Sequence, residues 1–301
     1  MGWRAAYYTR LVRSTLALCV LCLTACGKPQ AAENRPPITV FAAASLVRPL
    51  ATLSDSFRAR SRITVQTEPG GSLEQARKLT DLGRVPDVLM LVDDDVMASL
   101  MPTHLDWYVR FATNRLVVAY TAKSRRADSI TADNWYAVLT SPNVTVGRAD
   151  PAVAPVGTRA IALLKRAGAY YHKASLSDRL IEHAPLRFVR PNAAELAALL
   201  ETGEVDYIVD YLSVARQYGF RFVELPQDLA PPVLYGISVP RAAPHFAEGV
   251  EFVSFLLSDD GKRLLRSSFV DVLGTPVATG SVLPPEISGI VRTASAARLD
   301  R

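Results

Sequence analysis

Small residues, hydroxyls and two aspartates follow the short apolar β-type runs of this sequence. These junctions read Ala44-Ser45, Gly71-Ser72, Asp150 with Val156-Gly157, and Asp210-Tyr211. Ligands of open α/β sheets bind beyond the carboxyl ends of the strands, so one ligand held between two halves of the chain would contact all four junctions. Backbone N–H groups and serine hydroxyls there would suit a compact oxoanion. Taken singly, Ser45 and Ser72 are also ordinary helix-capping residues.

The stretch from Thr145 to Ala169 carries the strongest of these signals. A β-type run, 144–146, stops at Gly147, and a helical run begins at Pro155-Val156-Gly157. Proline suits the first position of a helix, where its missing N–H costs nothing. The free N–H groups of that first turn carry roughly half a positive charge. Asp150 therefore stands where an anion should bind.

Asp150 and Asp210 have two interpretations. Asp150 precedes a proline, as turn-forming aspartates commonly do. Beside sulfate or phosphate, two carboxylates would repel the ligand. An oxoanion of a high-valent metal differs, because molybdenum or tungsten accepts further oxygen ligands up to octahedral geometry. The same carboxylates would then reject sulfate and phosphate by repulsion.

The start of the chain predicts a secreted lipoprotein. Three arginines within the first 13 residues precede an apolar stretch, Leu16 to Leu23, that is too short to span a membrane. The ending Leu23-Thr24-Ala25-Cys26 resembles a bacterial lipobox, which places lipid on Cys26; an ordinary signal with an incidental cysteine is the alternative. We expect a signal peptide at 1–25 and a lipidated polar tether at 26–37.

Cysteine content and charge exclude several functions. Cys19 and Cys22 lie in the predicted signal peptide, so the mature chain would have no free thiol for catalysis or metal binding. Three of the 34 basic residues, and no acidic ones, lie in the same segment, which leaves 31 basic and 29 acidic side chains and a net charge of +2. That balance does not favour nucleic acid.

The remaining pattern alternates strands and helices. Runs at 38–41, 63–68 and 85–92 predict strands, and Leu46, Leu50, Leu53 and Phe57 repeat at helical spacing. Ser72 and Gln75 predict a capping box for the second helix. Runs at 114–121, 186–189, 205–209 and 233–239 continue the series, with helical runs at 192–200, to Tyr218 and over 246–265. The alternation predicts a parallel, doubly wound sheet.

Five motifs together resemble the tungstate/molybdate-binding proteins of ABC importers, in the branch described as coordinating the metal octahedrally. They are Asp106-Trp107-Tyr108 through Asn114-Arg115, Asp133-Asn134-Trp135-Tyr136, Gly203-Glu204-Val205-Asp206-Tyr207, Ser213-Val214-Ala215 and Tyr235-Gly236, within a resemblance that runs from about Ile38 to Pro276. The resemblance implies an α/β, two-lobed type II periplasmic-binding-protein fold with doubly wound mixed sheets and a two-strand hinge. Lobe 1 would be 38–113 plus 236–287, lobe 2 would be 114–235, and 288–301 a loose tail.

The resemblance also implies the site. It assigns oxoanion-binding roles to Ser45, Ser72, Asp150, Val156, Asp210, Tyr211 and Tyr235, with Asp150 and Asp210 as carboxylate ligands to the metal of the oxoanion. Ala44 stands where the family usually has glycine, and Val156 stands where it has cysteine, although a backbone N–H survives that change. Asp210 replaces a glutamate and is one methylene shorter, which leaves six-, five- or four-fold coordination open.

The implied protein is a monomeric, lipid-anchored binding protein of the periplasm or cell surface. It would deliver tungstate or molybdate to a membrane permease, with no cofactor, no catalysis and no nucleic-acid partner. An enzyme is disfavoured, because there is no G-x-S-x-G elbow and the four histidines, His104, His172, His183 and His245, are scattered.

Two alternatives remain. One is the same fold holding sulfate, phosphate, a metal cation or a carboxylate ligand such as an amino acid. Arg148 and Arg159 could clamp such a carboxylate, although we favour a solvated face, or a salt bridge to the transporter, for both. The other is an envelope lipoprotein without a ligand.

Overall fold

The structure, a computed structural model, describes residues 35–280 and 282–293. By its contacts the chain divides after Arg35, and the fold below is that of the unit beginning at Pro36. The predicted signal peptide and lipidation site Cys26 lie outside the described residues, as does most of the predicted tether. In the part of the chain that is described, no helix has the length and apolar character needed to cross a bilayer.

The first of two mixed sheets has seven strands in the order β12-β11-β4-β10-β3-β1-β2. Its strands are β1 (Ile38–Ala43), β2 (Val65–Gly70), β3 (Val88–Val92), β4 (Trp107–Asn114), β10 (Val233–Ser238), β11 (Asp271–Gly280) and β12 (Arg292–Thr293). Its helices are η1 (Ala44–Leu46), α2 (Val47–Ser61), α3 (Ser72–Thr80), α4 (Asp94–Ser99), α10 (Phe246–Leu257), α11 (Asp259–Ser267) and α12 (Pro285–Ser288). We call this part lobe 1. β1, β2 and β3 are parallel, whereas β10 is antiparallel to β3 and β4.

The second sheet has five strands in the order β7-β6-β8-β5-β9. Its strands are β5 (Leu116–Tyr120), β6 (Val146–Ala149), β7 (Val189–Arg190), β8 (Tyr207–Tyr211) and β9 (Arg221–Glu224). Its helices are α5 (Trp135–Leu139), α6 (Pro155–Tyr170), α7 (Leu176–Glu182), η2 (Leu186–Phe188), α8 (Ala193–Thr202) and α9 (Leu212–Gln217). We call this part lobe 2. β6 and β8 are parallel, and β5 is antiparallel to β8 and β9.

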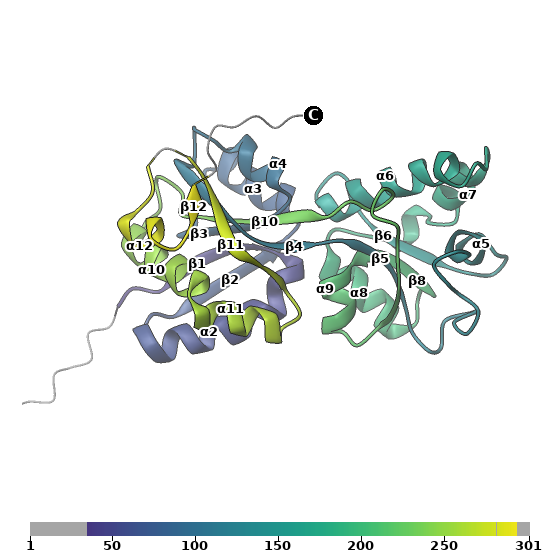
Figure 1. The fold of residues 1–301 in the computed structure, drawn as a ribbon, viewed down its shortest axis with the longest axis horizontal. Coiled ribbons are helices and arrows are strands. Elements are labelled where there is room, and N and C mark those ends of the chain that lie inside the picture. The colour runs from purple at the N-terminus through teal and green to yellow at the C-terminus, as the bar shows by residue number, and fades with distance from the viewer. Residues whose placement is uncertain (1–34, 281, 294–301) are drawn as a thin grey trace, which may run out of the picture. The chain divides into compact units, whose positions relative to one another are not determined.

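Helices cover both faces of each sheet (Figure 1). In lobe 1, α3 and α4 lie on one face and α2 and α11 on the other; in lobe 2, α6 lies opposite α8 and α9. Strands that are covered on both faces should be apolar throughout. β3 and β5 meet that expectation, since every residue of each is buried. The two doubly wound, mixed sheets that the resemblance implies are present. β1, β2 and β3 run parallel, as the alternation predicts, whereas β4 and β5 run antiparallel to both of their neighbours.

Two chain segments connect the lobes. β4 passes into β5 through Arg115, and the chain returns from β9 into β10. The register pairs Val233, at the start of β10, with Asn114, at the end of β4. The crossing strands are therefore hydrogen-bonded to each other where they leave lobe 1, as a two-strand hinge requires.

Several strand limits differ from the predictions. β3 begins only at Val88, and Leu186–Phe188 form η2, whereas three other strands extend further toward the site. β6 continues through Gly147 to Ala149, and β8 includes Asp210 and Tyr211, which pair with Val117 and Leu116 of β5. β2 extends to Gly70 because Pro69 and Gly70 pair with the end of β1. Neighbouring strands thus fix these ends where local sequence indicates a turn.

Asp206, in the Gly203–Tyr207 motif, holds lobe 2 together. Its carboxylate accepts hydrogen bonds from the backbone N–H of Arg125 (2.9 Å) and Thr145 (2.8 Å), from Thr145 Oγ1 (2.9 Å) and from Arg125 Nη1 (2.8 Å). Burial alone would raise the pKa of Asp206, but these bonds outweigh it and the net pKa is lowered. The motif residue is therefore structural.

We predict that Asp206→Ala lowers the free energy of unfolding by roughly 2–3 kcal/mol at neutral pH, since several buried donors lose their acceptor. The folded-state pKa lies below the unfolded value, so this contribution is present above about pH 4 and is lost as the pH falls through the folded pKa. Urea unfolding of the parent and the variant at pH 7 and pH 3.5 measures both effects. A pH-independent difference would contradict the assignment.

Candidate anion-binding site

A small cavity lies where the carboxyl ends of β1, β2 and β3 meet the first turns of α6 and α8. It is lined by Ala43, Ala44, Ser45, Gly70, Gly71, Ser72, Val92, Ala154, Pro155, Val156, Asn192, Ala193 and Tyr211. Its volume of about 10 Å³ is the size of a single water site. The structure therefore brings together Ser45, Ser72, Val156 and Tyr211, which the sequence placed in one site.

Four helix starts converge on this cavity. η1 begins at Ala44, α3 at Ser72, α6 at Pro155 and α8 at Ala193. The first N–H groups of a helix have no acceptor inside it and carry partial positive charge. Local sequence fixes two of these starts: Pro155 occupies the first position of α6, and Asn192 caps α8 by accepting the N–H of Glu195 at 3.0 Å. The walls of the cavity thus favour an anion.

Neither serine caps a helix. The Ser72–Gln75 capping box is wrong, because Gly71 precedes α3 and the Gln75 side chain donates instead to the Glu68 carbonyl at 3.0 Å. Ser72 Oγ accepts the backbone N–H of Val92 at 3.1 Å. Because that oxygen acts as an acceptor, the hydroxyl proton of Ser72 remains available to donate to a ligand.

Ser45 is oriented by a buried hydrogen-bonded chain below the cavity. Asn114 Nδ2 donates to the Tyr235 phenol oxygen at 2.7 Å and to Ser213 Oγ at 2.7 Å. The Tyr235 oxygen lies 3.0 Å from Ser45 Oγ. The phenol accepts from Asn114 and can donate to Ser45, an arrangement that leaves the Ser45 proton free for a ligand. Tyr235 does not line the cavity, and its contact with the site runs through Ser45.

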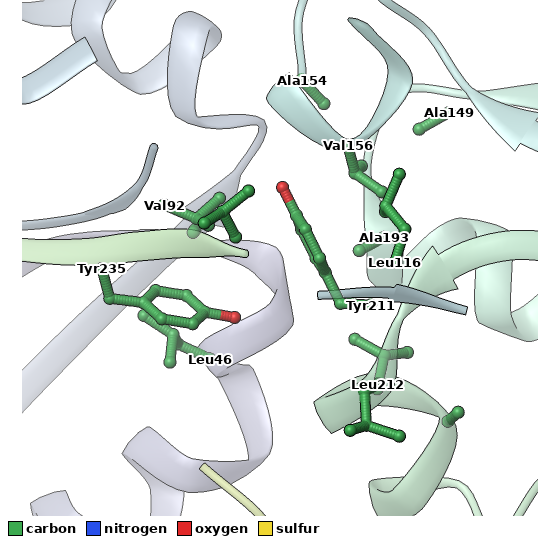
Figure 2. Close-up of a cluster of buried hydrophobic side chains, with 14 of the residues drawn as sticks. Leu46, Val92, Leu116, Ala149, Ala154, Val156, Ala193, Tyr211, Leu212 and Tyr235 are labelled. Atoms are coloured by element: carbon green, nitrogen blue, oxygen red, sulfur yellow. The ribbon is translucent and has the colours of Figure 1, made fainter. Parts of the chain in front are cut away.

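Asp210 and Tyr211 carry buried polar atoms without partners. Asp210 is fully buried; its Oδ1 accepts the N–H of Tyr211 at 2.7 Å, whereas its Oδ2 has no hydrogen-bond partner among the described residues. Burial raises the pKa of Asp210 well above its ordinary value. The Tyr211 hydroxyl is also unpartnered, and Figure 2 shows it directed between Val92 and the α6 start at Ala154 and Val156. Burial likewise raises the pKa of Tyr211 well above its ordinary value.

Asp150 shapes the loop before α6. Its Oδ1 accepts the N–H of Ala152 at 2.8 Å, and its carbonyl accepts those of Val153 (3.3 Å) and Ala154 (3.0 Å). The side chain is half-buried and does not line the cavity. The turn interpretation of this aspartate is thus present in the structure, and its role as a metal ligand stays a prediction.

The predicted solvated face for Arg148 and Arg159 is wrong, because Arg148 is buried and Arg159 is paired within the protein. A salt bridge to the transporter stays a prediction. Arg148 is buried in β6, and desolvation lowers the pKa of its guanidinium despite the nearby charge of Asp150. Arg159, in α6, forms an ion pair with Asp93: Nη2 and Nε lie 2.8 and 2.9 Å from the same carboxylate oxygen.

Sequence reasoning missed the contributions of α8 and of β3. The pattern Asn192-x-x-Glu195 marks a helix start and would have indicated a fourth N-terminus. Val92 lies at the end of a strand that was predicted, but no residue type there indicates a site. A larger cavity of about 610 Å³, bordered by α10 and α12, is mostly apolar and holds none of these helix starts.

Comparison with solved structures identifies the fold. A periplasmic molybdate-binding protein from Azotobacter vinelandii matches over 82% of this chain and 99% of its own, with a TM-score of 0.63 and 16% identity. The sulfate-binding protein SubI from Mycobacterium tuberculosis H37Rv matches over 80% and 88%, with a TM-score of 0.65 and 15% identity. At such identities the likeness establishes the fold alone, that of the type II periplasmic binding proteins.

The family follows from sequence. A model described as bacterial extracellular solute-binding protein matches residues 38–269. The molybdate/tungstate-binding protein WtpA of Pyrococcus abyssi is 32% identical over 320 residues, which cover 88% of this chain and 92% of that protein. This chain belongs to the bacterial extracellular solute-binding protein family, whose members bind solutes and are not enzymes.

Tyr211→Phe removes a buried hydroxyl that has no hydrogen-bond partner among the described residues. We predict that the unliganded variant is more stable by about 1 kcal/mol, because the desolvation cost of that hydroxyl is lost. We also predict about tenfold weaker tungstate binding, since one donor to the anion is lost. Thermal unfolding and titration calorimetry measure the two effects. A variant that is less stable and binds as tightly as the parent would place the hydroxyl outside the site.

Proposed function

We propose that this protein captures tungstate or molybdate between its two lobes and delivers it to the permease of an ABC transporter. In this proposal it is a monomer anchored by lipid on Cys26 in the periplasm or at the cell surface. The names of its relatives support the ligand, and the description of its family supports an extracytoplasmic location. The lipobox-like sequence before Cys26 supports the anchor.

The observation that carries the proposal is the buried, unpartnered Oδ2 of Asp210. A carboxyl oxygen without a donor is costly to bury, and surrounding donors would normally satisfy it. Asp210 does not itself line the cavity, but it adjoins Tyr211, which does, and a metal centre that accepts carboxylate oxygens would supply the interaction that Oδ2 lacks. We therefore assign Asp210 as one metal ligand of the bound oxoanion.

Asp150 is the second proposed carboxylate ligand. One of its oxygens is engaged by the N–H of Ala152, which holds the side chain in a fixed orientation at the start of α6. A ligand oriented in this way loses little freedom on binding. Ser45, Ser72, Tyr211 and the N–H of Val156 would donate to the oxo groups, with Tyr235 positioning Ser45.

A five-atom oxoanion is larger than the cavity, whose volume is about 10 Å³. Entry therefore requires the lobes to separate, and the two connecting segments near Asn114 and Val233 are the proposed hinge. Hinge-bending around a ligand is a known way for a binding protein to signal occupancy. The permease would then recognise the ligand-bound arrangement.

Sulfate is the second candidate, and the pKa of Asp210 favours it specifically. A neutral Asp210 carboxyl would donate a hydrogen bond to sulfate and would not coordinate a metal. The turn hydrogen bond of Asp150 also accounts for that residue without a metal. The two candidates make opposite predictions for the effect of pH.

We predict that tungstate and molybdate raise the unfolding temperature more than sulfate or phosphate does, because a ligand of the folded state stabilises it by mass action. Asp150→Asn keeps the turn acceptor but removes the charge. It should leave the unliganded midpoint unchanged and weaken tungstate binding by about tenfold or more. A panel led by sulfate, or an Asp150→Asn variant with parental tungstate affinity, would contradict this assignment.

Coordination of the metal requires ionised Asp210. Because burial raises the pKa of Asp210, tungstate binding must release a proton at any pH below that pKa. Affinity should then rise with pH, by up to about tenfold per unit, until the pH passes that pKa. Donation from a neutral Asp210 to sulfate predicts the reverse. Calorimetry between about pH 6.5 and 9, in buffers of different ionisation enthalpy, counts the proton. The Asp210→Asn variant has no ionisable group at this position. Its affinity should therefore not change with pH through this group, and binding should release no proton from it.

A further inference from the structure

An ion pair joins the two lobes beside the proposed site. Asp93 directly follows β3 of lobe 1, and Arg159 lies in the second turn of α6 of lobe 2. The side chains are 13% and 28% exposed, so solvent screens their attraction only partly. Neither residue lines the cavity, but each is within four residues of one that does, Val92 and Val156.

The backbone of Asp93 is held in an unfavourable conformation. Its φ of 85° and ψ of 112° lie outside the regions that side chains other than glycine normally adopt. Such a conformation persists only where the surroundings fix it, and it is concentrated at functional sites. Here the Asp93 N–H donates to the Leu234 carbonyl at 2.9 Å, next to the start of β10. In this conformation, which costs backbone energy, the carboxylate reaches Arg159 of lobe 2.

Arg159 in turn orients the start of α6. One Asp93 oxygen accepts from both Nε and Nη2 of Arg159, which fixes the plane of the guanidinium. A second contact joins the same loop to lobe 1, because the N–H of Glu74 donates to the Val153 carbonyl at 3.2 Å. Gly71 permits this approach: a Cβ there would lie 2.1 Å from the same carbonyl oxygen.

We propose that Asp93 and Arg159 are a positioning pair that seats the N-terminus of α6 against the end of β3 and so sets the affinity of the anion site without contacting the anion. The affinity part of this proposal rests on the proposed function. A protein whose binding-competent arrangement is only partly populated binds with an affinity reduced by that fraction. The pair raises the fraction by stabilising one arrangement of the lobes.

The test uses Asp93→Asn, Arg159→Gln and the double variant, with tungstate as the probe. Each single variant should weaken tungstate binding by about 3- to 10-fold, mainly through faster dissociation. The double variant should bind tungstate no more weakly than the single variant with the lower affinity, because each substitution removes the same ion pair. Additive losses would overturn the proposal.

Asp93→Asn also separates positioning from direct contact. If Arg159 bound the anion itself, the Asp93 carboxylate would compete with the anion for Arg159. Its removal would then leave tungstate affinity unchanged or raise it, and that result would overturn the proposal. The matched control is the ion pair of Arg110 with Asp94, at 2.7 Å and 20% and 28% exposed, which lies wholly within lobe 1. Arg110→Gln and Asp94→Asn should leave tungstate affinity unchanged; losses equal to those at Asp93 would mean a general effect on stability.

A readout without ligand keeps this test separate from the proposed function. The sequence has no cysteine after Cys26, so one introduced cysteine per lobe can carry a spin label. Arg159→Gln and Asp93→Asn should each broaden the distance distribution between lobes, whereas the Arg110 and Asp94 variants should not. Unchanged distributions in both Asp93 and Arg159 variants would overturn the positioning role even if tungstate proves not to be the ligand.

Discussion

The structure depends on one unfavourable electrostatic arrangement. The donors around the cavity, four helix starts and two serine hydroxyls, favour an anion. Asp210 does not line the cavity, but it is fully buried in β8 next to the cavity residue Tyr211, and its Oδ2 has no partner among the described residues. Leaving such an oxygen unsatisfied costs about 1–3 kcal/mol, which a purely structural site would avoid. The cost becomes understandable if a ligand supplies the missing interaction. A metal centre that accepts carboxylate oxygens does so, and sulfur or phosphorus does not.

The fold by itself leaves the choice of ligand open. Solved structures titled as molybdate-binding and sulfate-binding match this chain about equally well, at TM-scores of 0.63 and 0.65. Converging helix N-termini serve either anion. In our proposal, a few side chains at the ends of strands discriminate between these anions, above all Asp150 and Asp210. The two differ in their surroundings, since Asp150 is half-buried in a turn and Asp210 is fully buried.

The sequence predicts those parts of the site that depend on neighbouring residues in the chain. Pro155 starts α6, and small residues follow β1 and β2, so the convergence of these ends could be inferred from the sequence. The role of Ser72 could not, because its partner is the N–H of Val92, which belongs to a different strand. The full length of β8 was also missed, since Asp210 and Tyr211 are held in the strand by β5.

Interactions between the two lobes could not be predicted from the sequence. The sequence predicts a solvated face for Arg159, and no local pattern links this residue to Asp93, 66 positions earlier. The unusual backbone of Asp93 likewise leaves no trace in residue type, as glycine is the residue expected there. Long-range pairs of this kind relate the site to the arrangement of the lobes, and they become visible only in three dimensions.

The most direct test of the central claim is X-ray absorption at the tungsten edge of the protein–tungstate complex. Coordination of Asp150 and Asp210 predicts six oxygen ligands around tungsten, two of them at longer distance than the four oxo groups, and a shell reduced by one in Asp210→Ala. A regular tetrahedral shell of four equivalent oxygens in both proteins would contradict the account, because the carboxylates would then not bind the metal.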